Sequence, residues 1–157
     1  MFKWPQAGVP AHIPPAYCQY DSHYCGAASV QMIMNSYRGS YQGTVQDQKD
    51  IYEWIEKHQA EPAPYKAPGM VRDAIHAFYP PPAPAHFVAP VFADGHVAMY
   101  SILLWMQRTN YPAAVMINGN HWVVISGYET DVAPEGNSSV VLHSIDINDP
   151  MPFCAPT

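Results

Sequence analysis

The pattern of apolar and polar positions changes at Cys25, where apolar residues begin to recur at near-helical spacing. The apolar members of this run are Ala28, Val30, Met32, Ile33 and Tyr37. Gly39 follows them as a helix-stop residue, so the run predicts a mostly buried helix at the centre of the core. Residues 1–24 have no helical or strand period and are rich in Pro, Tyr and His, so they are expected to lie extended across the surface.

Three more helices are expected before the chain changes character near residue 112. Thr44 begins an approximate capping box, which predicts a surface helix that ends near His58. The apolar stripe of that helix consists of Ile51, Trp54 and Ile55. A shorter helix is expected over Met70–Phe78, and a fourth over His96–Arg108.

Beyond residue 112 the period changes to that of β-strands. Three runs of β-branched or alternating residues have the length of strands, and turn-forming residues separate them. These runs are Ala113–Asn118, Trp122–Tyr128 and Val140–Ile147. Because helices come first and strands last, without βαβ alternation, this order predicts an α+β fold whose helices pack on one side of an antiparallel meander.

The length and net charge of the chain limit the number of domains and the kinds of partner that are expected. With 157 residues, the chain 1–157 is expected to form a single domain. The formal net charge is -6 with only 7 lysines and arginines, which argues against nucleic acid as the main partner, because such binding depends on clustered basic residues. No apolar run approaches the ~20 residues of a membrane span, so none is expected. The oligomeric state is left open.

The N-terminal residues indicate where in the cell the protein is expected, and the cysteines indicate whether disulfides or a metal site are expected. Residues 1–5 have neither the basic nor the apolar region of a secretory signal, so we expect a soluble protein of the bacterial cytoplasm or an exported protein whose leader has been removed. The three cysteines, Cys18, Cys25 and Cys154, fit neither a disulfide framework nor a paired-cysteine zinc site. No metal or cofactor is expected, and at least one thiol is expected to be free unless it pairs with another chain.

Cys25 is a candidate nucleophile, because it lies beside Gly26 at the start of the predicted buried helix. Helix N-termini carry unpaired N–H groups and partial positive charge, which favour the thiolate over the thiol. Cysteine chemistry also needs a base, and a further group that orients the base. His121, just before the second predicted strand, is the candidate base. It is far from Cys25 in the sequence, as expected for a site assembled by folding.

Three polar residues at the end of the last predicted strand are candidates to orient His121. Strand alternation places Asp146 and Asn148 on one face, and Asp149 on the opposite face unless the strand has already ended. Pro150 directly follows Asp149 and stops the strand. The residues alone therefore leave Asp149, Asn148 and Asp146 open as the orienting group.

Three short blocks, in this order, resemble the papain-like cysteine peptidases and, within them, the C39-like group of bacteriocin-processing peptidases. The blocks are Gln19 ahead of Tyr24-Cys25-Gly26-Ala27-Ala28-Ser29, then Gly119-Asn120-His121-Trp122-Val123-Val124-Ile125-Ser126-Gly127-Tyr128, then Ile147-Asn148-Asp149-Pro150. The resemblance implies a papain-like α+β fold in which a central catalytic helix packs on a C-terminal antiparallel sheet. For the site it implies the nucleophile Cys25, the base His121, the orienting residue Asp149 and the oxyanion donor Gln19.

The resemblance is to the C39-like group rather than to papain itself. Papain carries Cys-Gly-Ser/Ala-Cys-Trp/Tyr around its nucleophile and an Asn-Ser-Trp block, whereas this chain has Ser22-His23-Tyr24-Cys25-Gly26 and no such block. The implied activity is hydrolysis of a peptide or protein substrate through an acyl-enzyme. Two alternatives stay open: an acyltransferase of the transglutaminase or phytochelatin-synthase kind that uses the same residues, and a papain-like binding module without catalysis.

Overall fold

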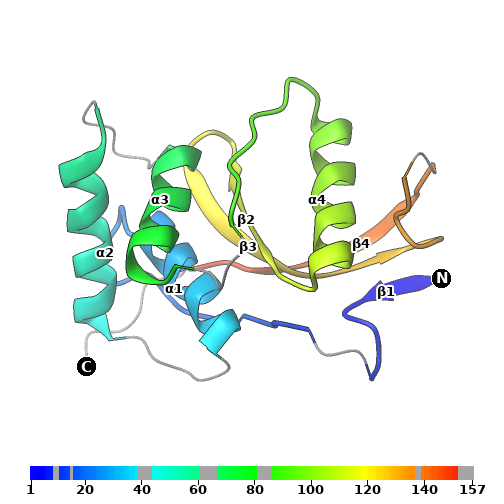
Figure 1. Ribbon diagram of the computed structural model, residues 1–157, viewed down its shortest axis with the longest axis horizontal. Helices are drawn as coiled ribbons and strands as arrows, with labels where there is room; N and C mark the ends of the chain where they lie inside the picture. Colours follow the sequence, from blue (N-terminus) through cyan, green and yellow to red (C-terminus); the bar gives the residue numbers. More distant parts are fainter. Residues whose placement is uncertain are drawn as a thin grey trace.

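The computed structural model describes residues 1–8, 11–14, 16–38, 44–60, 67–80, 86–136 and 139–151. Within these ranges four helices precede the main strands of an antiparallel sheet, as predicted for an α+β fold (Figure 1). The helices are α1 (Cys25–Arg38), α2 (Val45–His58), α3 (Pro68–Phe78) and α4 (Gly95–Thr109). The strands are β1 (Phe2–Trp4), β2 (Ala113–Ile117), β3 (His121–Thr130) and β4 (Leu142–Asn148).

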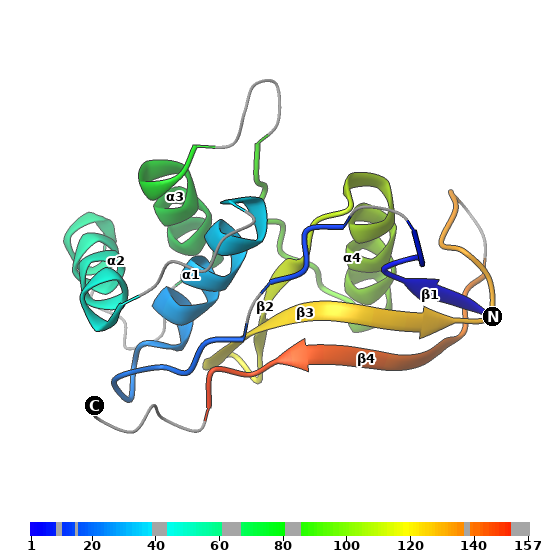
Figure 2. The same cartoon turned by 90° about the horizontal axis from the view of Figure 1, so that it is seen from below.

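Strand β3 lies at the centre of the sheet and pairs with each of the other strands in the described ranges (Figure 2). β4 runs antiparallel to it, from the pair Val124 and Asn148 to the pair Thr130 and Leu142. β2 pairs antiparallel with the first half of β3, and β1 with its last residues. The succession of β2, β3 and β4 is therefore the predicted meander. Strand β1 was not expected, because a strand of 3 residues is too short to show a period.

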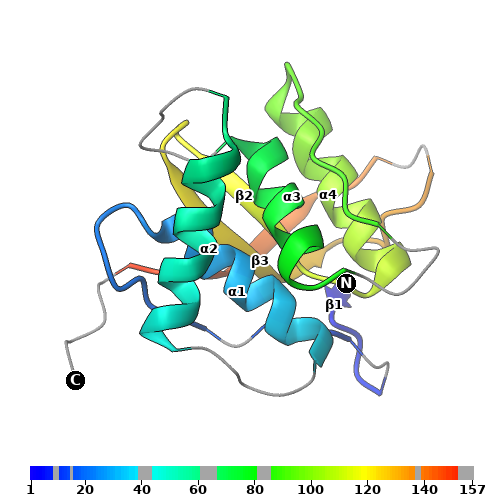
Figure 3. The ribbon, with the colours of Figure 1, turned by 60° about the vertical axis from the view of Figure 1, so that its left-hand side comes forward.

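Helices cover both faces of this sheet. One face packs against α1, α2 and α3, and its apolar residues are Ala114, Met116, Trp122 and Val124. The opposite face packs against α4, and its apolar residues are Ala113, Val115, Ile125 and Tyr128. Figure 3 shows the first three helices as one group, with α4 apart from them. The expectation that all helices share one side was wrong, because β2 and β3 are apolar on both faces and need cover on both.

Helix boundaries follow the local sequence signals. Thr44 caps α2 as predicted: its side chain accepts a hydrogen bond from the Asp47 backbone N–H at 3.2 Å, and the Asp47 carboxylate accepts one from the Thr44 N–H at 2.7 Å. α3 begins at Pro68, two residues ahead of the expected start at Met70, because proline is well tolerated at the first helical position. Gly39, the expected stop of α1, lies outside the described residues.

Helix α1 forms the centre of the core, as predicted. Every residue from Cys25 to Ser36 is buried. The helix packs against β3, β2, α2 and α3, so it is covered on all sides. In the described part of the chain, no helix combines the length and the apolar character needed to span a membrane.

Candidate active site

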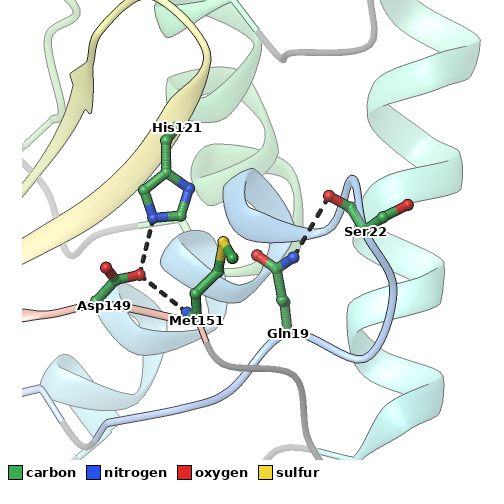
Figure 4. Close-up of polar contacts among 5 residues, drawn as sticks. All are labelled: Gln19, Ser22, His121, Asp149 and Met151. Atoms are coloured by element: carbon green, nitrogen blue, oxygen red, sulfur yellow. Dashed lines mark hydrogen bonds and ion pairs between the residues drawn. The ribbon is translucent and has the colours of Figure 1, made fainter.

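The imidazole of His121 contacts the carboxylate of Asp149, and Figure 4 shows the two groups pointing toward each other. His121 Nε2 lies 2.8 Å from Asp149 Oδ1. Asn118 and Gly119 have positive φ angles of 52° and 72° in the turn that leads from β2 into β3, and this turn places His121 at the first position of β3. β4 ends at Asn148, so Asp149 has left the strand and its side chain no longer follows the alternation.

The same oxygen of Asp149 holds a second group. Oδ1 accepts a hydrogen bond from the backbone N–H of Met151 at 2.9 Å, which closes the turn around Pro150 (Figure 4). The side chain of His121 is 20% exposed and that of Asp149 is 41% exposed, so the pair is accessible from solvent. Because Asp149 occupies Nε2, the ring nitrogen left for proton transfer is Nδ1.

Asn148 and Asp146, the other two orienting candidates, contact different groups. The Asn148 side chain donates to the Pro14 carbonyl at 2.9 Å and accepts from the Ser126 hydroxyl at 3.3 Å. The Asp146 carboxylate lies against Gly127, next to an irregularity in the pairing of β3 with β4. Of the three candidates, Asp149 is therefore the one that contacts His121.

Cys25 is the first residue of α1 and is buried, with 4% of its surface exposed. A turn leads into the helix: the Tyr24 N–H donates to the Asp21 carbonyl at 3.1 Å, and the Ala28 N–H donates to the Tyr24 carbonyl at 2.8 Å. At this position the Cys25 N–H has no acceptor within the helix. The first turn contains no acidic residue, so no nearby carboxylate on the helix opposes its positive end.

Packing places Cys25 beside the strand that carries His121. Cys25 belongs to the buried cluster that contains Trp122 and Val124 of β3. Its thiol is free, and none of the hydrogen bonds in the described part of the chain joins it to His121. Hydrophobic packing therefore holds Cys25 in one cluster with the residue that follows His121, whereas His121 itself is held by a hydrogen bond to Asp149.

Gln19 is almost completely buried, with 1% of its surface exposed. Its backbone N–H donates to the Pro150 carbonyl at 2.8 Å. Its side-chain Nε2 donates to the Ser22 carbonyl at 3.4 Å, while Oε1 has no hydrogen-bond partner among the described residues (Figure 4). Buried polar atoms are normally hydrogen-bonded, because desolvation without a partner is costly. The Gln19 carboxamide therefore has unused hydrogen-bonding capacity, including its second N–H.

The Asp149-Pro150 pair joins the three motif blocks in space. Asp149 bonds to His121, and Pro150 bonds to Gln19, which precedes Cys25 on the way into α1. The side chains of this cluster were candidates from the sequence, but the backbone carbonyl that holds Gln19 was not. The Asp-Pro dipeptide marked a turn, but no pattern of side chains identifies a backbone acceptor such as the Pro150 carbonyl.

The two other cysteines differ from Cys25 in their state or in their place in the chain. Cys18, directly before Gln19, is disulfide-bonded, and Cys25 is the free cysteine among the described residues. Cys154 lies outside those residues. Within the described ranges, no three His, Cys, Asp or Glu side chains come close enough together to hold a metal ion.

A large cavity lies away from this cluster. It has a volume of about 740 Å³ between α3, α4 and β2, and its walls are mainly apolar and aromatic. The walls include Phe87, Phe92, Trp105 and Trp122. Cys25, His121, Asp149 and Gln19 do not line it. The walls also include His86 and Tyr111, but the candidate nucleophile and the candidate base lie outside the cavity.

In comparisons with known proteins, no family model matches this chain, and no curated protein or solved structure matches it significantly.

Proposed function

We propose that this chain is a cysteine peptidase with a papain-like fold, similar to the C39-like group. The single observation that carries the proposal is the hydrogen bond of 2.8 Å between His121 Nε2 and Asp149 Oδ1. His121 directly precedes Trp122, and Trp122 belongs to the same buried cluster as the free Cys25 at the start of α1. A histidine oriented by a carboxylate next to a free cysteine at a helix N-terminus is the arrangement that thiol-based acyl transfer needs.

The bond to Asp149 gives His121 one defined protonation pattern. A carboxylate accepts hydrogen bonds, so Nε2 carries a proton and donates it toward Asp149. Nδ1 is then free to take the proton of the Cys25 thiol, and the resulting thiolate and imidazolium stabilise each other. Catalytic hydrogen bonds in free enzymes are often long and shorten when substrate binds, so a Cys25–His121 distance beyond hydrogen-bond length in the free protein is compatible with this proton transfer.

The thiolate of Cys25 attacks the carbonyl carbon of the scissile peptide bond, and the carbonyl oxygen becomes an oxyanion. The Cys25 backbone N–H and the second N–H of the Gln19 carboxamide are the donors for that oxyanion, each worth about 3 kcal/mol. His121 then protonates the leaving amine, which departs and leaves a thioester on Cys25. Water, deprotonated by His121, hydrolyses the thioester and regenerates the thiol.

A peptide library incubated with the wild-type protein and with Cys25→Ala and His121→Ala tests this proposal. We expect cleavage by the wild type, none by Cys25→Ala, and a loss on the order of a hundredfold or more in His121→Ala. His143→Ala is the matched control, because His143 is an exposed histidine of β4, and it should cleave like the wild type. Cleavage by Cys25→Ala, or no cleavage by the wild type, would refute the proposal.

The same library separates hydrolysis from acyl transfer. In a second incubation, an added amine competes with water for the thioester on Cys25. A peptidase releases the free carboxylic acid as the main product in both incubations, whereas an acyltransferase releases the amide of the added amine.

A further inference from the structure

Gln48 is a completely buried polar residue of α2, with 0% of its surface exposed. Its carboxamide makes three hydrogen bonds. Oε1 accepts from the Tyr20 backbone N–H at 3.2 Å. Nε2 donates to the Cys18 carbonyl at 2.8 Å and to Gln31 Oε1 at 2.9 Å. The side chain therefore uses both of its N–H groups and its oxygen, and none of these bonds lies within its own helix.

Two of these bonds fall on the backbone groups that flank Gln19. The Cys18 carbonyl belongs to the peptide unit before Gln19, and the Tyr20 N–H belongs to the peptide unit after it. Holding both units fixes the backbone dihedral angles of Gln19 and thus the direction in which its side chain leaves the chain. The Gln19 N–H itself is held by the Pro150 carbonyl at 2.8 Å, so the backbone at this residue is fixed at three points.

The third bond connects this arrangement to the helix of the nucleophile. Gln31 lies on α1 and is 2% exposed, and it joins Gln48 in the interior between α1 and α2. Gln48 therefore relates the position of Gln19 to the helix that begins with Cys25. A buried amide that left these partners would leave several polar groups unsatisfied, so the arrangement has little freedom to vary.

We infer that Gln48 is a positioning residue for Gln19: it holds the backbone on both sides of Gln19 so that the carboxamide of Gln19 reaches the oxyanion. This inference rests on the proposed peptidase function. A donor that stabilises only the transition state contributes to kcat and not to KM. Loss of the positioning residue should therefore appear in kcat.

The test compares Gln48→Met, which keeps the length of the side chain and removes its hydrogen bonds, with Gln46→Met, the same change at an exposed residue of α2. We expect kcat to fall about tenfold in Gln48→Met at unchanged KM, after correction for the fraction of active protein. The control Gln46→Met should stay within about twofold of the wild type.

A double variant separates positioning from a general structural role. Gln19→Ala should lower kcat about a hundredfold, and adding Gln48→Met should lower it no further, because the residue that Gln48 positions is already gone. A further tenfold loss in the double variant, or an unchanged kcat in Gln48→Met, would overturn the inference. If Gln48→Met does not fold, Gln48→Asn takes its place, because the shorter asparagine side chain cannot reach both backbone groups. An unchanged kcat in Gln48→Asn, or a further tenfold loss when it is added to Gln19→Ala, would then overturn the inference.

The two proposals fail in different ways. The peptidase proposal fails if wild-type turnover does not depend on Cys25. In that case, amide hydrogen exchange still tests the hydrogen bond from the Tyr20 N–H to Gln48 Oε1. Faster exchange of the Tyr20 N–H in Gln48→Met than in Gln46→Met supports the inference that Gln48 fixes this backbone. Equal exchange in the two variants overturns it.

Discussion

One oxygen of Asp149, Oδ1, accepts hydrogen bonds from both the imidazole of His121 and the backbone N–H of Met151, at 2.8 and 2.9 Å. The carboxylate that orients the imidazole is therefore itself oriented by the turn at Pro150. The carbonyl of Pro150 in turn accepts the N–H of Gln19. The candidate base His121 and the candidate oxyanion donor Gln19 are thus positioned by the same short segment.

Replacing the Asp149 carboxylate should impair the proposed base, His121, without unfolding the protein. We predict that Asp149→Ala lowers kcat on the order of a hundredfold, because the His121 ring loses its defined tautomer and orientation. Asp149→Asn should lose less, since an amide oxygen still accepts from Nε2. Steady-state kinetics on a peptide cleaved by the wild type is the measurement.

Asn148→Ala is the matched control for that prediction. Asn148 is adjacent in sequence but bonds to Pro14 and Ser126, so its loss should change stability more than kcat. A larger loss of kcat in Asn148→Ala than in Asp149→Ala would show that the orienting role has been assigned to the wrong residue.

A side chain at Gly127, where the pairing of β3 with β4 is irregular, should destabilise the protein. A Cβ built there meets the carboxylate of Asp146. We predict that Gly127→Ala lowers the free energy of unfolding by about 1–3 kcal/mol, as overpacking does elsewhere. Urea denaturation measures the change. Removing the obstructing carboxylate with Asp146→Ala should recover part of the loss in the double variant, whereas strictly additive losses would exclude this contact as the cause.

Asp131 should make the connection between β3 and β4 sensitive to acid. Its carboxylate accepts hydrogen bonds from the backbone N–H groups of Val141 at 2.8 Å and Val132 at 2.9 Å. These bonds, that of Val141 foremost, lower the pKa of Asp131 below its ordinary value of 3.8. Because the pKa is lower in the folded than in the unfolded chain, the stabilisation is complete above the ordinary value and disappears as the pH falls through the folded-state pKa.

The comparison of wild type with Asp131→Asn measures this effect. The wild type should have the higher Tm near neutral pH, and the difference should shrink between about pH 5 and about pH 2. A difference in Tm that stays constant over that range would mean that the Asp131 charge does not contribute.

The sequence predicted the helices and the meander because their signals are local. The apolar run after Cys25 and the capping box at Thr44 are readable within a few residues, and both predictions were confirmed. The face of the sheet that α4 covers could not be predicted from such local signals. Its apolar face indicated burial, but the choice between the two faces of the sheet depends on long-range packing against β2 and β3.

The candidate site was predicted as a set of side chains, and the sequence could not rank its orienting candidates. The choice between Asp149 and Asn148 depends on where β4 ends, and a difference of one residue reverses the face. Gln48 was overlooked for a related reason. It precedes Ile51 and Ile55 on the buried stripe of α2, but a glutamine on a mostly polar helix does not show by itself that it is buried.

The most direct test of the central claim is the rate at which iodoacetamide alkylates Cys25 at about pH 5.5, where an ordinary thiol is almost fully protonated. Mass spectrometry of the Cys25 peptide measures this rate in the wild type and in His121→Ala, with alkylation at alkaline pH as the control for access. If Cys25 and His121 form a thiolate–imidazolium pair, the wild type reacts at least tenfold faster than His121→Ala at the acidic pH. Equal rates in the two proteins would contradict the claim that His121 activates Cys25.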